Sequence, residues 1–166
     1  MEPDLINSKT WAVTSTVEKW DKAGDRALGL PPDDTVSVED NLLVNEGIQL
    51  LLDLLIGAGG TAFNNANSYI GVGDSSTAAS AAQTGLQASS NKDYQGMETS
   101  FPSRSGQTVT WKAVWGSSEG NFAWNEWSIA NGSSDNTATN LNRKVASLGT
   151  QSSGSEWTLT VTITVS

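Results

Sequence analysis

The chain has 166 residues, with nine Lys and Arg against 18 Asp and Glu, and its formal net charge is −9. Such an acidic chain lacks the basic surface that binds nucleic acid through counterion release, so a nucleic-acid partner is excluded. It contains neither cysteine nor histidine, which excludes disulfides, thiolate metal sites and a Ser-His-Asp triad within the chain. Hydrophobic residues make up 37% and charged residues 16%, and the many Gly, Ser, Thr and Asn residues favour a β-rich domain with polar loops.

The N-terminal stretch MEPDLINSKTW has neither a basic start nor an apolar core, so we do not expect a signal peptide. The longest apolar run, Leu50 to Ile56, is interrupted by Asp53 and is too short to span a bilayer. We therefore expect no membrane partner.

Residues 1–36 are predicted to form an extended N-terminal arm, because glycines, prolines and mixed charges interrupt every periodic pattern there. The arm contains Trp11 and Trp20 but no core of its own, so these two side chains are the candidate interface residues. We expect them to dock on the remaining domain, residues 37–166, or on a neighbouring copy.

The strongest local pattern follows in SVEDNLLVNEGIQLLLDLLIGAGG. Ser37 is a plausible N-cap with Asp40 three residues later, and Gly57 is a suitable C-terminal stop. The pattern predicts a helix between these residues, and Gly47 in its middle indicates a close approach to another backbone. We expect the helix to be buried against a sheet or across a subunit contact, through a broad apolar face made of Leu42, Leu43, Leu51, Leu54 and Leu55.

The rest of the chain predicts strands separated by polar loops. Strict alternation marks QTVTWKAVWG and the C-terminal EWTLTVTITVS, and shorter strands are predicted at Ser68–Ser75 and in FAWNEWSIA. LNRKVASLG is a further strand or a short bend, and a short helix is predicted around Ala78–Gln83, followed by a loop. The predicted fold is mainly β: an antiparallel β-sandwich with one apolar helix packed on it.

Glu126, between Trp124 and Trp127, is a candidate catalytic carboxylate. Glycoside hydrolysis needs a second carboxylate at a defined separation, and the spacing selects none of the possible partners, which are Asp74, Glu119 and Glu156. The favoured interpretation is structural: Glu126 lies on the strand face of Phe122 and Trp124, opposite Trp127 and Ile129, and pairs with Arg143 or Lys144. We therefore predict no catalytic residues.

Binding sites receive weaker support from the sequence. Alternation predicts buried side chains for Trp111, Trp115 and Trp157, whereas Trp124 or Trp127 could be half exposed and contact a sugar ring. NGSSDNTATN and GVGDSS lack the ligand spacing of a calcium loop, and the latter also lacks that of a phosphate loop. We predict no metal and no cofactor, and we expect the glycines of GVGDSS to permit close strand packing or a bulge.

The order of these motifs resembles a family of small virion proteins of tailed bacteriophages. The resemblance rests on NLLVNEGIQLLLDLL, SYIGVGDSS, FPSRSGQTVTWKAVWGSSEGNFAWNEWSIANG and LNRKVASLGTQSSGSEWTLTVTITVS, which together cover Asn41 to Ser166. The shared feature is the order of the motifs. A helix is followed by a strand that contains glycines, an aromatic strand, an Ala-rich strand that carries a Glu, and a final strand of Trp, Thr and Val. Residues 1–40 lie outside it.

This resemblance implies a non-enzymatic structural protein, bound in many copies to the capsid shell as a decoration or stabilising protein. A tail or fibre component is the alternative within the same class, and a host-surface carbohydrate-binding module is the alternative outside it. The implied partners are the major capsid or tail protein and further copies of the same chain. The implied location is the virion, assembled in the cytoplasm of the host bacterium.

Overall fold

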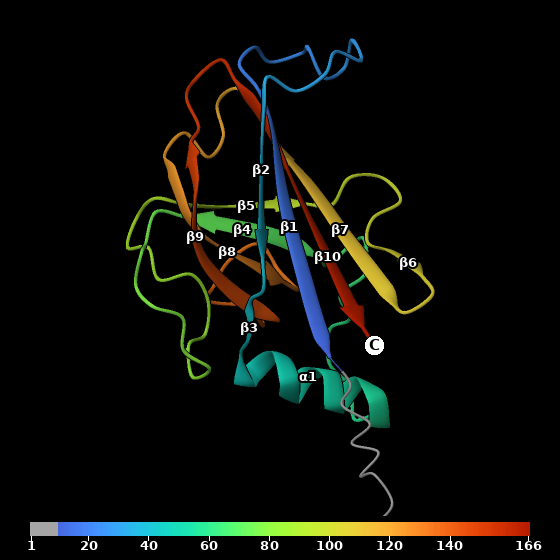
Figure 1. The fold of residues 1–166 in the computed structure, drawn as a ribbon. Coiled ribbons are helices and arrows are strands. Elements are labelled where there is room, and N and C mark those ends of the chain that lie inside the picture. Colours follow the sequence, from blue (N-terminus) through green and yellow to red (C-terminus); the bar gives the residue numbers. More distant parts are fainter. Residues whose placement is uncertain (1–9) are drawn as a thin grey trace, which may run out of the picture.

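The computed structural model describes residues 10–166, which form two antiparallel five-stranded sheets packed face to face (Figure 1). The strand order of the first sheet is β2-β1-β10-β7-β6, and that of the second sheet is β3-β9-β8-β4-β5. The strands of the first sheet are β1 Trp11–Trp20, β2 Asp34–Glu39, β6 Ser103–Ser105, β7 Thr108–Trp115 and β10 Glu156–Val165. Those of the second are β3 Leu42–Leu43, β4 Tyr69–Gly73, β5 Lys92–Gly96, β8 Ala123–Ala130 and β9 Asn142–Thr150, and the helix α1 is Asn45–Ile56. The predicted β-sandwich is confirmed.

The two strictly alternating segments become neighbouring strands in the first sheet. β10 pairs with β7 so that Trp157 lies opposite Trp115 and Val161 opposite Trp111. The three tryptophans of this pair point into the core and are buried, as their alternation predicts. The Thr side chains of β10 alternate with them on the other face, which gives this sheet one apolar and one hydroxyl-rich side.

The prediction of an extended arm is wrong for residues 10–36, the part of the predicted arm that the structure describes. β1 lies inside the first sheet, paired along its whole length with β10 and along much of it with β2 (Figure 1). The glycines and prolines that suggested an arm lie in the connection between β1 and β2 instead. Residues 1–9 lie outside the described part of the chain.

The predicted helix begins later than expected. Ser37 belongs to β2, where it pairs with Thr16 of β1, so cross-strand pairing overrides its capping potential. α1 begins at Asn45 after Val44, whose side chain makes no capping hydrogen bond. Its end matches the prediction, because Gly57 adopts the left-handed conformation with φ 72° and its amide bonds back to Leu54.

Other short elements also differ from expectation. The predicted helix around Ala78–Gln83 is absent from the structure, and this segment is an irregular loop. β5 begins in the segment after Ala78–Gln83 that was expected to be a loop, and β6 lies where no element was predicted. Each is short and pairs with only one neighbouring strand. LNRKVASLG forms most of β9, so the strand interpretation of that segment is confirmed.

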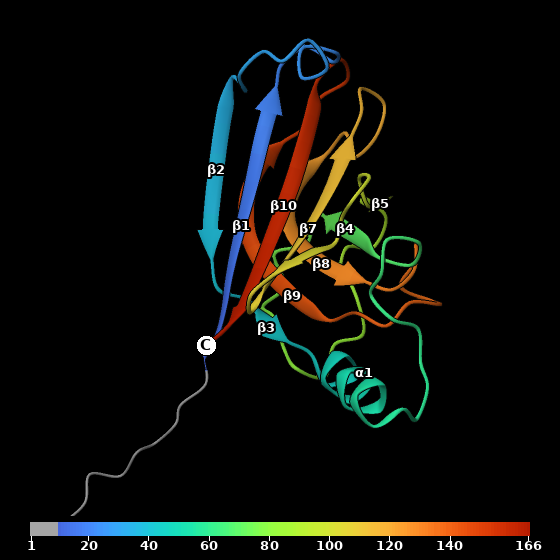
Figure 2. The same cartoon turned by 90° about the vertical axis from the view of Figure 1, so that its right-hand side faces the viewer.

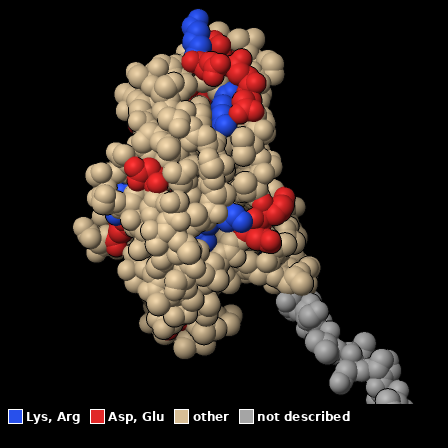
Figure 3. Space-filling model, turned by 60° about the vertical axis from the view of Figure 1, so that its left-hand side comes forward, with Lys and Arg blue, Asp and Glu red and all other residues tan. Residues whose placement is uncertain are grey.

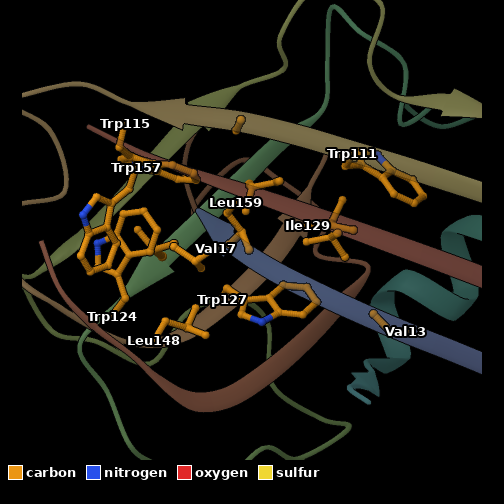
Figure 4. Packing of buried hydrophobic residues seen from close by; sticks show 14 of the residues in the cluster. Val13, Val17, Trp111, Trp115, Trp124, Trp127, Ile129, Leu148, Trp157 and Leu159 are labelled. Atoms are coloured by element: carbon orange, nitrogen blue, oxygen red, sulfur yellow. The ribbon is translucent and has the colours of Figure 1, made fainter. Parts of the chain in front are cut away.

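Three tryptophans join the two sheets (Figure 4). Trp124 of the second sheet packs edge-to-face against Trp115 and Trp157 of the first, with ring centroids 4.7 and 4.9 Å apart. Trp124 and Trp127 are both fully buried in this core although they are three residues apart, which simple alternation forbids. The β8–β9 ladder shifts register between Trp124 and Glu126, as at a β-bulge, and this irregularity brings both indoles to the same side.

The helix α1 lies outside the sandwich, beneath one of its ends (Figure 2). It touches the second sheet through Gly47, where an added Cβ would lie 2.4 Å from the carbonyl oxygen of Leu141 and 2.7 Å from that of Asn140. The predicted close approach of another backbone to Gly47 is thus confirmed. The predicted burial of the helix is only partly correct, because Leu52 and Leu55 point away from the protein and are exposed.

We expect Gly47→Ala to lower the free energy of unfolding by about 2 kcal/mol, because the backbone of Leu141 must move to accommodate the new methyl group. This loss exceeds the gain in helix propensity of about 1 kcal/mol. Chemical denaturation measures the change, with Gln49→Ala on the exposed side of the same helix as the control. A Gly47→Ala protein as stable as the parent would contradict the close backbone contact.

Lys19 near the end of β1 connects the core to the edge of the first sheet. Its Nζ lies 4.8 Å from the centroid of the Trp157 ring and 2.8 Å from Oδ2 of Asp34. The hydrogen bond from Lys19, together with its positive charge, lowers the pKa of Asp34 below its ordinary value of 3.8. A carboxyl group with a lowered pKa in the folded state stabilises the fold above pH 3.8 and loses this contribution as the pH falls through the lowered value.

We therefore expect Asp34→Asn to reduce stability slightly at pH 7 and to have progressively less effect as the pH falls below 3.8. Equilibrium unfolding of both proteins between pH 7 and pH 2 measures this difference. In a Lys19→Met background the substitution should have a much smaller effect, because only the backbone hydrogen bond from Thr35 then lowers the pKa of Asp34. A difference that persists unchanged at pH 2 would contradict the role of the Lys19–Asp34 pair.

Candidate functional site

The Glu126 carboxylate is fully buried on the outer side of the second sheet, away from the tryptophan core. Arg143 of β9 donates from Nε to Oε2 of Glu126 at 2.7 Å, and its Nη2 forms an ion pair with the same oxygen at 2.7 Å. Of the two predicted partners, Arg143 is therefore the correct one. The predicted face is wrong: Glu126 lies opposite Gly73 and points outward, whereas Trp124 points into the core, because the register shift separates the two.

The Glu126–Arg143 pair holds the connection between β4 and β5 against the sheet. Oε2 and Oε1 of Glu126 accept hydrogen bonds from the backbone amides of Gln87 at 2.9 Å and Ala88 at 2.7 Å. The Arg143 guanidinium donates to the carbonyl oxygen of Thr77 at 2.9 Å and to Oε1 of Gln83 at 3.0 Å. The pair thereby satisfies its own buried hydrogen-bonding groups while fixing a long polar loop, residues 74–91.

A second acid, Asp135, binds the same loop at Leu86, the residue before Gln87. Its carboxylate accepts a hydrogen bond from the backbone amide of Leu86 at 3.1 Å and pairs with Lys92 Nζ at 2.6 Å. The hydroxyl of Tyr94 also donates to it. Three consecutive amides, 86 to 88, are thus bound by two carboxylates. Asp135 is not among the residues predicted for this site, because no spacing in the sequence connects it with the loop.

Gly71 and Gly73 of β4 leave the space that this arrangement needs. A Cβ at Gly71 would lie 2.4 Å from the Tyr94 ring, and one at Gly73 would lie 2.5 Å from Oε1 of Glu126. The close strand packing or bulge expected at these glycines is not what they provide: they make room for the Tyr94 ring and the Glu126 carboxylate. The 74–91 loop therefore covers the part of the outer face around Glu126.

The candidate catalytic partners of Glu126 are engaged elsewhere. Asp74 accepts a hydrogen bond from Asn91, Glu119 accepts one from the amide of Gly116, and Glu156 pairs with Arg26. The Glu126 carboxylate itself has no exposed surface. Its hydrogen bonds to the loop and its charge pair with Arg143 leave no open face for a substrate.

The tryptophans offer no exposed row of rings for a sugar, since six of the seven are buried, Trp124 and Trp127 completely. The expectation that Trp124 or Trp127 could be half exposed is therefore wrong. Of the two candidate interface residues, Trp20 is buried, and its Nε1 donates to the carbonyl oxygen of Leu30 at 2.9 Å. Trp11 is only partly buried and lines an apolar groove.

This groove, which we call the α1 groove, lies between the helix and the end of the first sheet and has a volume of about 320 Å³. Nine of its ten lining residues are apolar. Leu51 and Leu54 contribute one wall from α1, and strands β1, β7 and β10 contribute the other through Trp11, Val109, Trp111, Ile163 and Val165. It is an apolar hollow with a partly exposed indole at its wall.

The outer face of α1 continues this apolar surface beyond the groove. Four side chains form it, with exposed fractions of 39% for Ile48, 55% for Leu52, 79% for Leu55 and 75% for Ile56. Their spacing places them along one side of the helix. We call these four residues the α1 stripe. The stripe and the groove together are the strongest candidate for a functional site, because exposed apolar side chains gathered beside an apolar groove are typical of interaction sites.

Charge gathers elsewhere on the molecule. On the face drawn in Figure 3, charged side chains cluster at the upper end, where the β1–β2 connection lies, and in smaller groups at mid-height on both edges, whereas the lowest part of the face is almost uncharged. No group of three or more acidic side chains within residues 10–166 is arranged to hold a metal ion. In the same part of the chain, no helix has the length and apolar character needed to cross a membrane.

The fold and this surface define the class of the protein as a two-sheet β-sandwich with an apolar surface at one end. Comparison with protein-family models, curated proteins and solved structures finds no match.

We expect Glu126→Gln to lower the free energy of unfolding by about 3 kcal/mol, since it leaves the buried Arg143 without its counter-charge. Chemical denaturation measures this loss. Hydrogen exchange of the Gln87 and Ala88 amides should accelerate more than that of the core strands, because these amides lose a charged acceptor.

The matched control is the double variant Glu126→Gln/Arg143→Met, which removes both members of the pair. Its loss of stability should be smaller than the sum of the two single losses, because neither charge is left alone. Strictly additive losses would contradict the direct pairing of the two side chains.

Proposed function

We propose that this protein is a non-enzymatic structural component of a bacteriophage particle, bound in many copies to the capsid shell as a decoration or stabilising protein. The observation that carries the proposal is the apolar surface formed by the α1 stripe and the α1 groove. Four exposed apolar side chains on one side of a single helix contribute nothing to the core of the sandwich, and a contiguous apolar patch of this kind marks an interaction site. In the proposed particle, this patch is the surface that binds the shell.

The internal chemistry of the chain supports the same proposal. The aromatic side chains that could handle a sugar join the two sheets instead, and the most buried carboxylate holds a loop. The pattern of motifs that resembles phage virion proteins runs through the same strands and through α1. A particle component needs this kind of cohesion and one adhesive surface, and it needs no reaction centre.

The proposed physical effect is stabilisation by mass action. A protein that binds assembled shell subunits and not the free ones lowers the free energy of the assembly by RT ln(1 + [L]/Kd). At a free concentration a hundred times Kd, this amounts to about 2.7 kcal/mol per site. Many weak copies thus add up to a substantial gain in particle stability.

Purified particles that carry this chain provide the test. We expect electron microscopy to show it at regular positions over the shell, and we expect particles that lack it to release their genome at a lower temperature. Density confined to the tail or its fibres would assign the chain to that part instead. Absence of the chain from purified particles would overturn the proposal.

A further inference from the structure

We infer that the α1 stripe is the docking site for an amphipathic helix of a second protein, one that carries Lys or Arg beside its apolar face. The inference names the kind of partner and the mode of contact, and it rests on the proposed function only for the identity of that partner as a particle protein. Three features of the described surface carry it: the spacing of the stripe, its backbone chemistry and its charge.

The spacing of the stripe fits another helix. Ile48, Leu52, Leu55 and Ile56 stand at positions i, i+4, i+7 and i+8 of a 12-residue helix. Such rows form the ridges that pack into the grooves of a facing helix. α1 therefore has two apolar sides. Its inner side, with Gly47 and Leu50, is buried against the rest of the protein, and the stripe lies on the other side. A surface helix normally turns one apolar stripe to the core and polar residues to water, so a second apolar stripe on its exposed side is suited to a partner.

The backbone chemistry of the site excludes an extended strand as its occupant. α1 satisfies its own amides and carbonyls internally, so its flank presents no free backbone groups to a partner. An extended segment laid on the stripe would bury its own amides and carbonyls without hydrogen bonds. A helical segment brings its backbone already satisfied and can insert an apolar side chain into the adjacent α1 groove.

The charge of the site selects a basic partner over a second copy of this chain. The sequence of α1 contains two acids, Glu46 and Asp53, and no Lys or Arg. Glu46 accepts a hydrogen bond from the Asn140 amide, which leaves Asp53 exposed beside the stripe. The last turn has no basic residue to offset the negative end of the helix dipole. In a complex of two copies through α1, the exposed Asp53 and the negative helix end of one copy would face those of the other. Each copy also has a net charge of −9, and this repulsion disfavours their association.

The first experiment uses the full chain and a synthetic amphipathic helical peptide with leucines on one face and lysines beside them. A second peptide has glutamate at every lysine position. Calorimetric titration should show binding of the lysine peptide at least tenfold tighter than that of the glutamate peptide. Equal affinity for the two peptides, or no binding of either, would overturn the inference.

Variants locate the contact. Leu55→Ser/Ile56→Ser should weaken binding of the lysine peptide at least tenfold without loss of thermal stability, because both side chains are exposed. The matched control is Leu28→Ser/Leu30→Ser, which removes two exposed apolar side chains from the β1–β2 connection at the opposite end of the molecule. An equal loss in the control would overturn the assignment to α1.

A charge reversal tests the choice of partner. Asp53→Lys should weaken binding of the lysine peptide and strengthen that of the glutamate peptide, whereas Asp21→Lys in the β1–β2 connection should change neither. Analytical ultracentrifugation completes the set. A dimer of the parent protein that dissociates on Leu55→Ser/Ile56→Ser would make a second copy the occupant and overturn the inference.

The outcomes separate this inference from the proposed function. Selective peptide binding by a chain that is absent from particles would retain the docking site and reject the virion role. Particle binding that survives Leu55→Ser/Ile56→Ser would retain the virion role and reject the docking site.

Discussion

The register shift between Trp124 and Glu126 is the constraint on which much of this structure depends. It allows two indoles three residues apart to enter the same core and turns the intervening acid to the opposite side of the sheet. Trp124 can then fit between Trp115 and Trp157 and join the two sheets by edge-to-face contacts. Without the shift, strict alternation would place Glu126 on the same side of the strand as Trp124, at the cost of burying a carboxylate in an apolar core.

The outward position of Glu126 has its own consequence, because it organises the outer face of the second sheet. A buried ion pair is a weak source of net stability, but removing one partner is costly, so such a pair favours one arrangement over others. Here it selects the position of the 74–91 loop through the amides of Gln87 and Ala88 and the side chain of Gln83. We interpret the pair as a device for specificity. It covers one outer face of the sandwich with the chain's own polar segment and leaves the end near α1 as the apolar surface.

The sequence predicted what depends on local periodicity and missed what depends on distant pairing. β7 and β10 were predictable because one buried face imposes a period of two residues, and the end of α1 was predictable because Gly57 alone favours the left-handed stop. The sequence of β1 does not predict its place in the sheet, because its partners, β2 and β10, lie beyond a loop or at the far end of the chain. Ser37 was misplaced for the same reason, since pairing with β1 outweighs a capping bond. In the site, Arg143 was predicted as a partner, but the loop amides and Asp135 were not, because nothing in the sequence places them beside the sheet.

The helix α1 has the broad apolar face that the sequence predicts, but only part of this face is buried. The fold uses Gly47 and Leu50 on one side of the helix and leaves the α1 stripe in water. Leaving such side chains exposed forgoes about 25 cal/mol for each Å² of apolar surface that burial would remove from water. The sandwich cannot recover this energy itself, because α1 stands outside the sheets and its inner side already lies against the backbone of Leu141. No segment within residues 10–166 covers the stripe, so on the proposal above a second molecule removes it from water, and the exposed Asp53 beside it favours a molecule of complementary charge.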